Sequence, residues 1–326
     1  MKNIYLPQYK ETMSSTTTLI NYIMGKNTSQ RIYRLLLLLS FFLIIVLIFK
    51  QLKGSYSHEG FVQNQRFLTK YNSDIYDDFY ANIYDKIHKP EIQNVVVLKA
   101  IQMTQPTEFS LILDVGCGTG HQMKEMQNHN WKVFGIDKSE DMVNYALQKY
   151  PDLKIKTGDV KEPMMYDKHT FSHVLCAGFT IYQFKDKITV FRNIHYWLIP
   201  NGYFIVHLAD KNKFDPIVPS GKPFLSISPQ KYNQERINTT EIDFFDFKYK
   251  NNVNFNTNSK TDVVVTETFV DSLTHHVRQN EQTLYFTELT DILYEIQYCG
   301  FLLHSQINMK ECGDEYQYCF IFEKIL

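Results

Sequence analysis

Cysteine is scarce in this sequence, and its positions follow no pattern. Five cysteines occur in 326 residues, and no two of them form a C-x-x-C pair. They are Cys117, Cys176, Cys299, Cys312 and Cys319. An odd and scattered set argues against a disulfide framework and against a zinc site. Free cysteines are typical of a reducing compartment, which we therefore expect for this chain.

The sequence also lacks an excess of charge of either sign. Its 34 basic residues are matched by 35 acidic residues, so we expect no nucleic-acid partner that binds through a broad basic surface. No group of histidines and acidic residues has the spacing of metal ligands, and we predict no metal site. We find no internal repeat, and nothing in the sequence indicates an oligomeric state.

One long apolar run stands near the N-terminus. Leu35–Phe49 reads LLLLLSFFLIIVLIF and contains no charge. With its apolar and basic flanks the run reaches the ~17–25 residues of a membrane span, so we predict a transmembrane helix over 32–52. The residues before it, 1–31, are predicted to be a polar tail. Residues 53–71 are predicted to be a stalk.

Two other interpretations of this run remain open. A cleaved signal peptide would have a cleavage site with small residues after the apolar run, where this chain has Lys50 and Lys53. A buried core helix is the second alternative, although fifteen apolar residues leave no polar face for water. A retained single-pass anchor fits the sequence best.

The most informative stretch is Leu111–Gly120, LILDVGCGTG. An apolar run that leads into a glycine-rich turn, with a helical pattern after it, is typical of a buried parallel strand and a nucleotide-binding loop. Glycines allow the backbone to take positive φ or to approach a ligand closely. The helix expected after the loop would direct its free N–H groups at that ligand.

This stretch resembles motif I of the class I S-adenosylmethionine-dependent methyltransferases, with Asp137 at the end of the next strand as the expected acid. The resemblance extends from Tyr76 to Leu326. A dinucleotide oxidoreductase is the main rival for such a loop. Its G-x-G-x-x-G fingerprint would require a third glycine at position 121, which is His121, whereas the third glycine here is Gly120.

The resemblance implies S-adenosylmethionine as the cofactor. Asp137 would accept hydrogen bonds from the ribose hydroxyls, Asp159 and Val160 would contact the adenine, and Asp114 would lie near the methionine end. The aromatic segment from Tyr76 to Tyr84 would cover the cofactor, although these rings are equally well explained as core. The cofactor-binding residues implied by the resemblance are Tyr76, Tyr84, Asp114, Gly116, Cys117, Gly118, Gly120, Asp137, Lys138, Met142, Asp159, Val160 and Cys176.

Strand-like and helix-like segments alternate from residue 72 to residue 209, which predicts an α/β fold with a doubly wound, mostly parallel sheet. The family resemblance implies seven strands, with an antiparallel last strand. Residues 210–280 interrupt the alternation, and we predict that they form an inserted, β-rich substrate lid. The methyltransferase domain is thus expected to cover 72–326.

Methyl transfer needs an aligned nucleophile and, where that nucleophile is protonated, a base. His207 at the end of the fifth strand is the best-placed histidine by topology, although a lone histidine on a strand is more often a core residue. Sequence signatures of nucleic-acid methyltransferases, such as Asn/Asp-Pro-Pro-Tyr, are missing. We therefore expect a small-molecule or lipid substrate. A membrane-tethered, non-catalytic cofactor-binding protein is the alternative.

The expected location follows from the cofactor. S-adenosylmethionine is made in the cytosol, so we expect the domain to face that side of the membrane, with the tail across it. The basic residues flanking the apolar run are nearly symmetric and give no orientation. Asn238 and Asn27 are glycosylation acceptors that would report a lumenal location.

Overall fold

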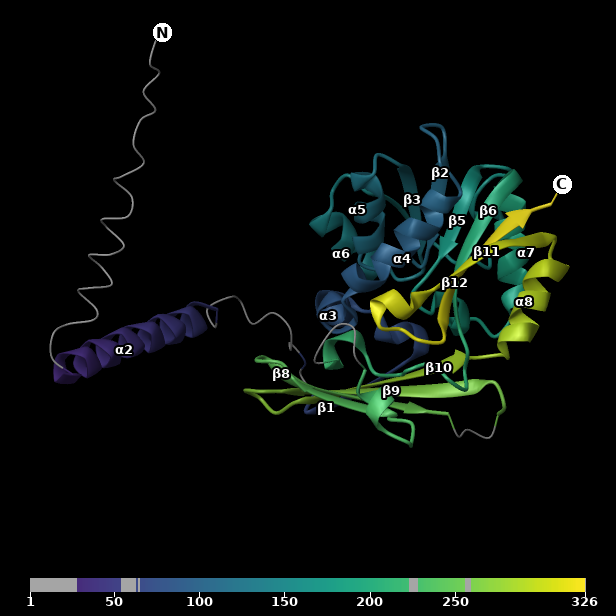
Figure 1. The fold of residues 1–326 in the computed structure, drawn as a ribbon. Coiled ribbons are helices and arrows are strands. Elements are labelled where there is room, and N and C mark those ends of the chain that lie inside the picture. Colours follow the sequence, from purple (N-terminus) through teal and green to yellow (C-terminus); the bar gives the residue numbers. More distant parts are fainter. Residues whose placement is uncertain (1–27, 54–62, 64, 223–227, 256–258, 326) are drawn as a thin grey trace, which may run out of the picture. The chain divides into compact units, whose positions relative to one another are not determined.

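The computed structural model describes residues 28–53, 63, 65–222, 228–255 and 259–325. The chain divides into two units, residues 1–59 and 60–326. The first unit contains helix α2 (Thr28–Lys53), and the second contains the remaining described elements (Figure 1). The predicted polar tail lies outside the described residues up to residue 27.

A seven-stranded sheet forms the centre of the second unit, in the order β11-β12-β6-β5-β2-β3-β4. Its strands are β2 (Leu111–Val115), β3 (Lys132–Asp137), β4 (Lys154–Thr157), β5 (Phe171–Cys176), β6 (Leu198–Ala209), β11 (Phe301–Asn308) and β12 (Gln317–Lys324). Strands β2 to β6 pair in parallel, and β12 is antiparallel to both of its neighbours. The predicted doubly wound sheet with an antiparallel last strand is confirmed.

Helices cover both faces of this sheet, because its central strands are apolar on both sides. They are α4 (Pro90–Met103), α5 (His121–Asn128), α6 (Glu140–Lys149), α7 (Lys187–Trp197) and α8 (Leu289–Tyr298). Helix α3 (Asp78–His88) instead packs against α6 and the second sheet. Val97 of α4 and Met123 of α5 belong to one buried cluster. Phe191 of α7 and Ile296 of α8 belong to another. The result is a three-layer α/β/α arrangement.

A second sheet has the strand order β1-β10-β9-β8-β7. Its strands are β1 (Phe67–Tyr71), β7 (Thr239–Asp243), β8 (Phe247–Asn254), β9 (Asp262–Asp271) and β10 (Val277–Tyr285). The predicted insert therefore does form antiparallel strands, and its sheet continues beyond residue 280. Strand β1 lies within the predicted stalk and pairs in parallel with β10. We call this second sheet the lid sheet, after the predicted lid. Figure 1 shows it lying beside α3, across one end of the larger sheet.

Short 3₁₀ turns connect several of these elements. They are η1 (Asn72–Ile75), η2 (Pro163–Met165), η3 (Thr180–Gln183), η4 (Pro219–Gly221), η5 (Pro229–Tyr232) and η6 (Met309–Cys312). Turn η3 directly follows β5, and η1 leads into α3, so both stand where a ligand at the end of the parallel strands would lie.

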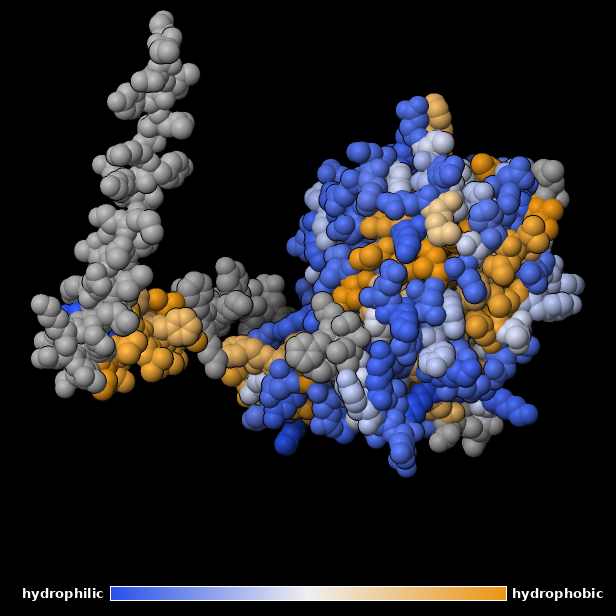
Figure 2. Space-filling model, in the orientation of Figure 1, coloured by the Kyte–Doolittle hydropathy of each residue, from blue (hydrophilic) through white to orange (hydrophobic). Residues whose placement is uncertain are grey.

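Helix α2 requires a correction to the sequence analysis. Among the residues that the structure describes, no helix is long and apolar enough to cross a membrane. The predicted transmembrane helix over 32–52 is therefore not supported. Where α2 is coloured in Figure 2, its surface is mainly hydrophobic.

Candidate active site

The glycine loop between β2 and α5 is shaped by three backbone positions in the left-handed region. Gly116, Gly118 and Gly120 have φ angles of +71°, +51° and +73°. A Cβ on Gly118 would meet no heavy atom within 4 Å, whereas one on Gly120 would lie 2.6 Å from Cδ1 of Leu153. Gly118 thus borders open space, and Gly120 allows the loop to pack against its neighbours.

Asp137 ends β3 and holds this loop in place. Its carboxylate accepts hydrogen bonds from the backbone N–H groups of Gly118, at 2.8 Å, and Ser139, at 2.9 Å. Burial raises the pKa of Asp137, while these backbone donors counteract the shift. A carboxylate has about four lone-pair sites, so Asp137 keeps acceptor capacity toward the cavity that it lines.

Asp159 and Val160 follow β4 and line the same cavity as Asp137. Nζ of Lys138 lies 3.1 Å from the Asp159 carboxylate, and Nζ of Lys161 lies 3.9 Å from it. The pKa of Asp159 is lowered; burial opposes this shift, and the N–H of Lys161 and the two lysines outweigh it. Asp159 and Val160, the residues predicted from the sequence to contact adenine, therefore lie together on one wall of the cavity, beside Gly158.

Helix α3 covers the glycine loop and brings its tyrosines to the site. Asp85 accepts a hydrogen bond from the Thr119 hydroxyl at 2.6 Å and forms an ion pair with Lys149. The Ser139 hydroxyl donates to the backbone carbonyl of Tyr76. These bonds fix α3 to the loop and to α6. The Tyr84 ring of α3 and the ring of Tyr76, just before α3, line the cavity, and their contact with a cofactor stays a prediction.

Asp114 lies at the inner end of the loop, on β2. Its side chain is buried, and burial followed by the charge of Asp137 raises its pKa to about 8. Because burying a charge is unfavourable, this carboxyl is suited to meet a cationic group, such as the ammonium of an amino-acid moiety. Cys117 beside it has a raised thiol pKa, so it is not an activated nucleophile.

Two adjoining cavities of about 220 Å³ each make up the site. One lies along β3 and β4, and the other lies between the glycine loop and the lid sheet. Both are lined by Tyr76, Tyr84, Gly116, Gly118, Gly178, Thr180 and Gln183. The site is therefore continuous from Asp159 to the lid.

The structure brings most of the sequence-predicted residues to these walls. The first cavity is lined by Tyr76, Tyr84, Gly116, Gly118, Asp137, Lys138, Met142, Asp159 and Val160. The second adds Asp114, Cys117 and His207. Gly120 and Cys176 line neither cavity: Gly120 packs against Leu153, and Cys176 is buried in the core beneath the site. Their predicted contact with a cofactor remains a prediction.

His207, the predicted base, reaches the second cavity from β6. Its Nε2 lies 2.9 Å from Oε1 of Gln317. Because an amide oxygen only accepts, Nε2 carries the proton and Nδ1 is an acceptor. Nδ1 is buried and has no hydrogen-bond partner among the described residues. Burial lowers the pKa of His207 to about 4, so the imidazole is neutral near pH 7.

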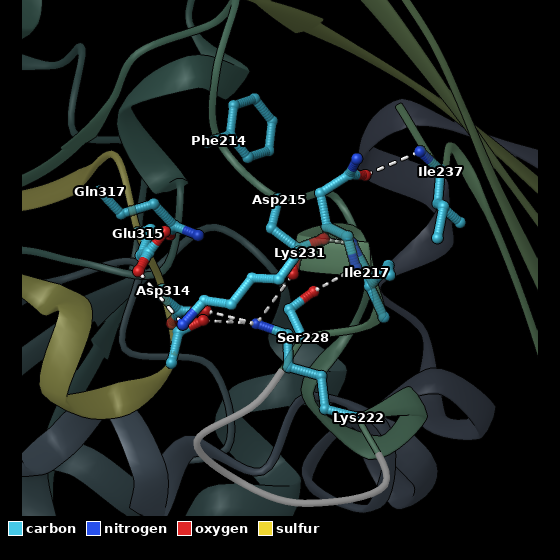
Figure 3. A network of polar contacts seen from close by, with 12 residues as sticks. Phe214, Asp215, Ile217, Lys222, Ser228, Lys231, Ile237, Asp314, Glu315 and Gln317 are labelled. Atoms are coloured by element: carbon cyan, nitrogen blue, oxygen red, sulfur yellow. Dashed lines mark hydrogen bonds and ion pairs between the residues drawn. The ribbon is translucent and has the colours of Figure 1, made fainter. Parts of the chain in front are cut away.

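Beside Gln317, a buried ion cluster ties the insert to the turn before β12 (Figure 3). Nζ of Lys222 lies 2.8 Å from the Asp314 carboxylate and 3.5 Å from that of Asp215. All three side chains are at least nine-tenths buried. Asp215 lines the second cavity, so this cluster fixes part of its wall.

The lid contributes residues that sequence reasoning missed. Glu267 of β9 accepts hydrogen bonds from the hydroxyls of Tyr80, at 3.0 Å, and Tyr249, at 2.8 Å. Gln282 of β10 donates to the Tyr76 hydroxyl at 2.8 Å. Alternation along a strand indicates which side chains share a face, but it does not show that this face closes over a cofactor loop. Gly178 was also missed, although its position shortly after a buried strand, β5, could have indicated that it lines the site.

The geometry fits S-adenosylmethionine. The open space at Gly118 would be filled by a Cβ, which is the form expected of a backbone cradle. Asp137 offers acceptors where ribose hydroxyls would lie, and Asp114 offers an anionic group where the ammonium would lie. Gln122 Nε2 of α5 is buried without a partner among the described residues and lines the second cavity, where it can donate to a carboxylate.

Comparison with known proteins supports this assignment. Residues 112–202 match a family model described as a methyltransferase domain. The chain is 28% identical over 142 residues to dTDP-4-amino-2,3,4,6-tetradeoxy-D-glucose N,N-dimethyltransferase of Saccharopolyspora spinosa, covering 41% of this chain and 56% of that protein. It is 33% identical over 121 residues to demethylmenaquinone methyltransferase of Chlorobaculum tepidum, covering 36% of this chain and 49% of that protein. The match thus spans about half the length of these curated relatives.

The fold comparison covers more of the chain. An S-adenosylmethionine-dependent methyltransferase from Clostridium acetobutylicum aligns with 76% of this chain and 98% of its own, with a TM-score of 0.57 and 14% identity. This likeness shows the fold. Together with the glycine loop and Asp137, it leads to one conclusion: residues 112–202 resemble a methyltransferase domain, and the second unit has the fold of S-adenosylmethionine-dependent methyltransferases.

Proposed function

We propose that this chain transfers a methyl group from S-adenosylmethionine to a small molecule by in-line displacement. The observation that carries the proposal is the continuity of the two cavities. One of them is lined by the glycine loop and Asp137. The other lies under the lid sheet and combines apolar side chains, such as Val263, Val265 and Phe286, with polar ones such as Glu267 and Gln282. Such a composition is typical of small-molecule sites.

Different residues of the chain bind the two ends of the cofactor and surround the methyl acceptor. S-adenosylmethionine supplies an activated methyl group on a cationic sulfur when it is bound. Gly116, Gly118 and Asp137 hold the nucleoside end, and Asp114 holds the amino-acid end. The tyrosine rings of α3 exclude water and offer π faces to positive charge. His207 lines the cavity on the side of the methyl acceptor as a neutral imidazole.

The relatives support a small-molecule acceptor. The two curated relatives reported above are named for a deoxyamino sugar nucleotide and for demethylmenaquinone. The second cavity, at about 220 Å³, is enclosed by β8, β9 and β10 on one side and by the glycine loop on the other. A cavity of this form suits one compact group better than a polymer.

Calorimetry with S-adenosylmethionine tests the proposal. Asp137→Ala should weaken binding roughly ten- to hundredfold, because charge-assisted hydrogen bonds contribute about 1.5–3 kcal/mol each. Asp152→Ala, at an exposed aspartate in the turn after α6, is the matched control and should bind like the unaltered protein. Equal affinity of the Asp137 variant would contradict the assignment, as would tighter binding of a nicotinamide dinucleotide.

A second experiment separates catalysis from cofactor binding. The protein is incubated with methyl-labelled cofactor and a metabolite extract, and labelled products are identified by mass spectrometry. Transfer that is lost in Asp137→Ala supports the enzyme. Cofactor binding without any labelled product would instead favour a non-catalytic, cofactor-binding protein.

We also propose that α2 holds the domain at a membrane and that the domain faces the cytosol. Thirteen large hydrophobic side chains between residues 32 and 47 are exposed in α2, and burying them in an apolar phase would be favourable. The five cysteines are free, which suits a reducing compartment. Expression in a eukaryotic cell provides the test. A glycan on Asn238 that disappears in Asn238→Gln would place the domain in the secretory lumen and contradict the proposal.

A further inference from the structure

The charges around the second cavity are of one sign. Its described lining contains three carboxyl side chains, Asp114, Asp215 and Glu267, and no lysine or arginine. Asp215 is paired with the buried Lys222, and Asp114 is assigned above to the ammonium of the cofactor. Glu267 is the carboxylate left for the acceptor. An anionic acceptor group would find no cationic partner on these described walls.

Glu267 is held in one orientation inside the domain. It is 6% exposed. Its Oε1 accepts the two tyrosine hydrogen bonds, and its Oε2 accepts one from Asn280 Nδ2 at 3.3 Å. These donors are neutral, and a carboxylate oxygen accepts more than one hydrogen bond. Oε2 therefore keeps capacity for a donor from the cavity.

The nearby arginine does not neutralise Glu267 directly. Arg278 forms an ion pair with Asp77 at 2.9 Å and donates to the carbonyl of Ile75 and to Asn280. Among the described residues, no lysine or arginine lies within the 4.0 Å of an ion pair with Glu267. A buried carboxylate without such a partner is costly, and a cationic ligand would supply the missing partner.

Two other residues on these walls, Asn251 and His207, carry buried hydrogen-bond acceptors. Asn251 is 3% exposed, and its Oδ1 has no hydrogen-bond partner among the described residues. His207 is 1% exposed, and its Nδ1 likewise lacks a partner there. Gln122 Nε2, an unpartnered donor, belongs to the cofactor end. The unpartnered polar atoms of Asn251 and His207 are therefore hydrogen-bond acceptors, and a ligand that donates hydrogen bonds would suit this end of the cavity.

We propose that the methyl acceptor is an amine and that Glu267 is the residue that selects it, an inference that rests on the proposed function. In the transfer, the lone pair of the neutral amine forms the N–C bond while the C–S bond breaks and its electron pair stays on sulfur. The positive charge thus moves from sulfur to nitrogen, and the product ammonium then releases a proton to water. Glu267, with the Tyr80 and Tyr249 rings, stabilises a cation at the acceptor position.

Matched pairs of amines and alcohols test this proposal. The full chain, saturated with S-adenosylhomocysteine, is titrated by calorimetry with tyramine and tyrosol, with hexylamine and hexan-1-ol, and with glucosamine and glucose. In at least one pair the amine should bind roughly ten- to hundredfold more tightly, because the alcohol cannot supply a cationic donor. The absence of a preference for the amine in all three pairs would overturn the proposal.

Two variants locate the preference. Glu267→Gln preserves the shape of the side chain and removes its charge, so the preference for the amine should disappear while the affinity for S-adenosylhomocysteine stays the same. Glu241→Gln, at an exposed acid of β7 in the same sheet, should keep the preference. A preference that persists in Glu267→Gln would overturn the role of Glu267. Failure of the unaltered protein to bind S-adenosylhomocysteine would instead refute the proposed function.

Discussion

Nε2 of His207 lies 2.9 Å from Oε1 of Gln317, and this hydrogen bond joins β6 to β12 beneath the acceptor cavity. It determines the tautomer of the imidazole, because the amide oxygen requires a donor. The histidine predicted as a base thus carries an unprotonated, buried Nδ1. Gln317 acts as a positioning residue for this group.

Replacing Gln317 by glutamate should raise the pKa of His207 from about 4 toward its ordinary value, because a nearby carboxylate stabilises the imidazolium. NMR titration of the histidine side chains measures this shift. Gln306→Glu, at an exposed position on β11, is the matched control and should leave the pKa of His207 unchanged. An unaltered pKa in Gln317→Glu would mean that the hydrogen bond is not formed in solution.

Two glycines of the loop should respond differently to the same substitution. Gly118→Ala adds a methyl group to the open cavity, so cofactor affinity should fall at least about tenfold with a stability loss of only about 1–2 kcal/mol. Gly120→Ala forces a Cβ to within 2.6 Å of Leu153, and we expect it to destabilise the fold more strongly. Calorimetry and denaturant unfolding of both variants measure these effects. Equal cofactor affinity in Gly118→Ala would show that the loop does not cradle the ligand.

Cofactor binding should release a proton from Asp114. Burial, followed by the charge of Asp137, raises its pKa to about 8, so the carboxyl is mostly protonated at pH 7 before binding. A cationic ammonium beside it lowers this pKa and expels the proton. Calorimetry at pH 7 in buffers of different ionisation enthalpy should report about one proton released, and Asp114→Asn should abolish the release. A binding enthalpy that is independent of the buffer would contradict this placement of the ammonium.

Acid should destabilise the domain through His173 of β5. Its ring bonds the hydroxyls of Thr104, at 2.9 Å, and Ser172, at 2.8 Å, and burial lowers its pKa to about 4. The folded state therefore binds this proton less readily than the unfolded state does. The contribution of neutral His173 to the free energy of unfolding is complete above about pH 6.5. It is lost as the pH falls toward 4, which lowers the free energy of unfolding by about 3 kcal/mol.

Urea unfolding at several pH values measures this contribution. His173→Gln should make the decline in unfolding free energy between pH 6.5 and pH 4 less steep. His304→Gln, on the exposed side of β11, serves as the control and should retain the original decline. If His173→Gln and the unaltered protein lose stability in parallel, the proton uptake belongs to other groups.

Much of the cofactor side could be predicted from the sequence, because it is encoded locally. A buried strand that ends in a glycine turn, with an acid after the next strand, needs no distant contact to be recognised. Parallel β2 and β3 are neighbours, so Gly118 and Asp137 meet wherever these strands pair. The alternation of strands and helices likewise predicted the sheet, since short crossover connections leave few arrangements.

The acceptor side was decided by tertiary structure. Glu267 and Tyr80 are 187 residues apart in sequence and 3.0 Å apart in space, and no periodicity predicts such a pairing. The addition of β1 to the lid sheet, beside β10, is equally remote, since 210 positions separate Phe67 from its partner Val277. Local residue patterns determine where a strand ends and a loop begins. The charge that faces a substrate depends on which distant surfaces pack together, and packing is a property of the whole chain.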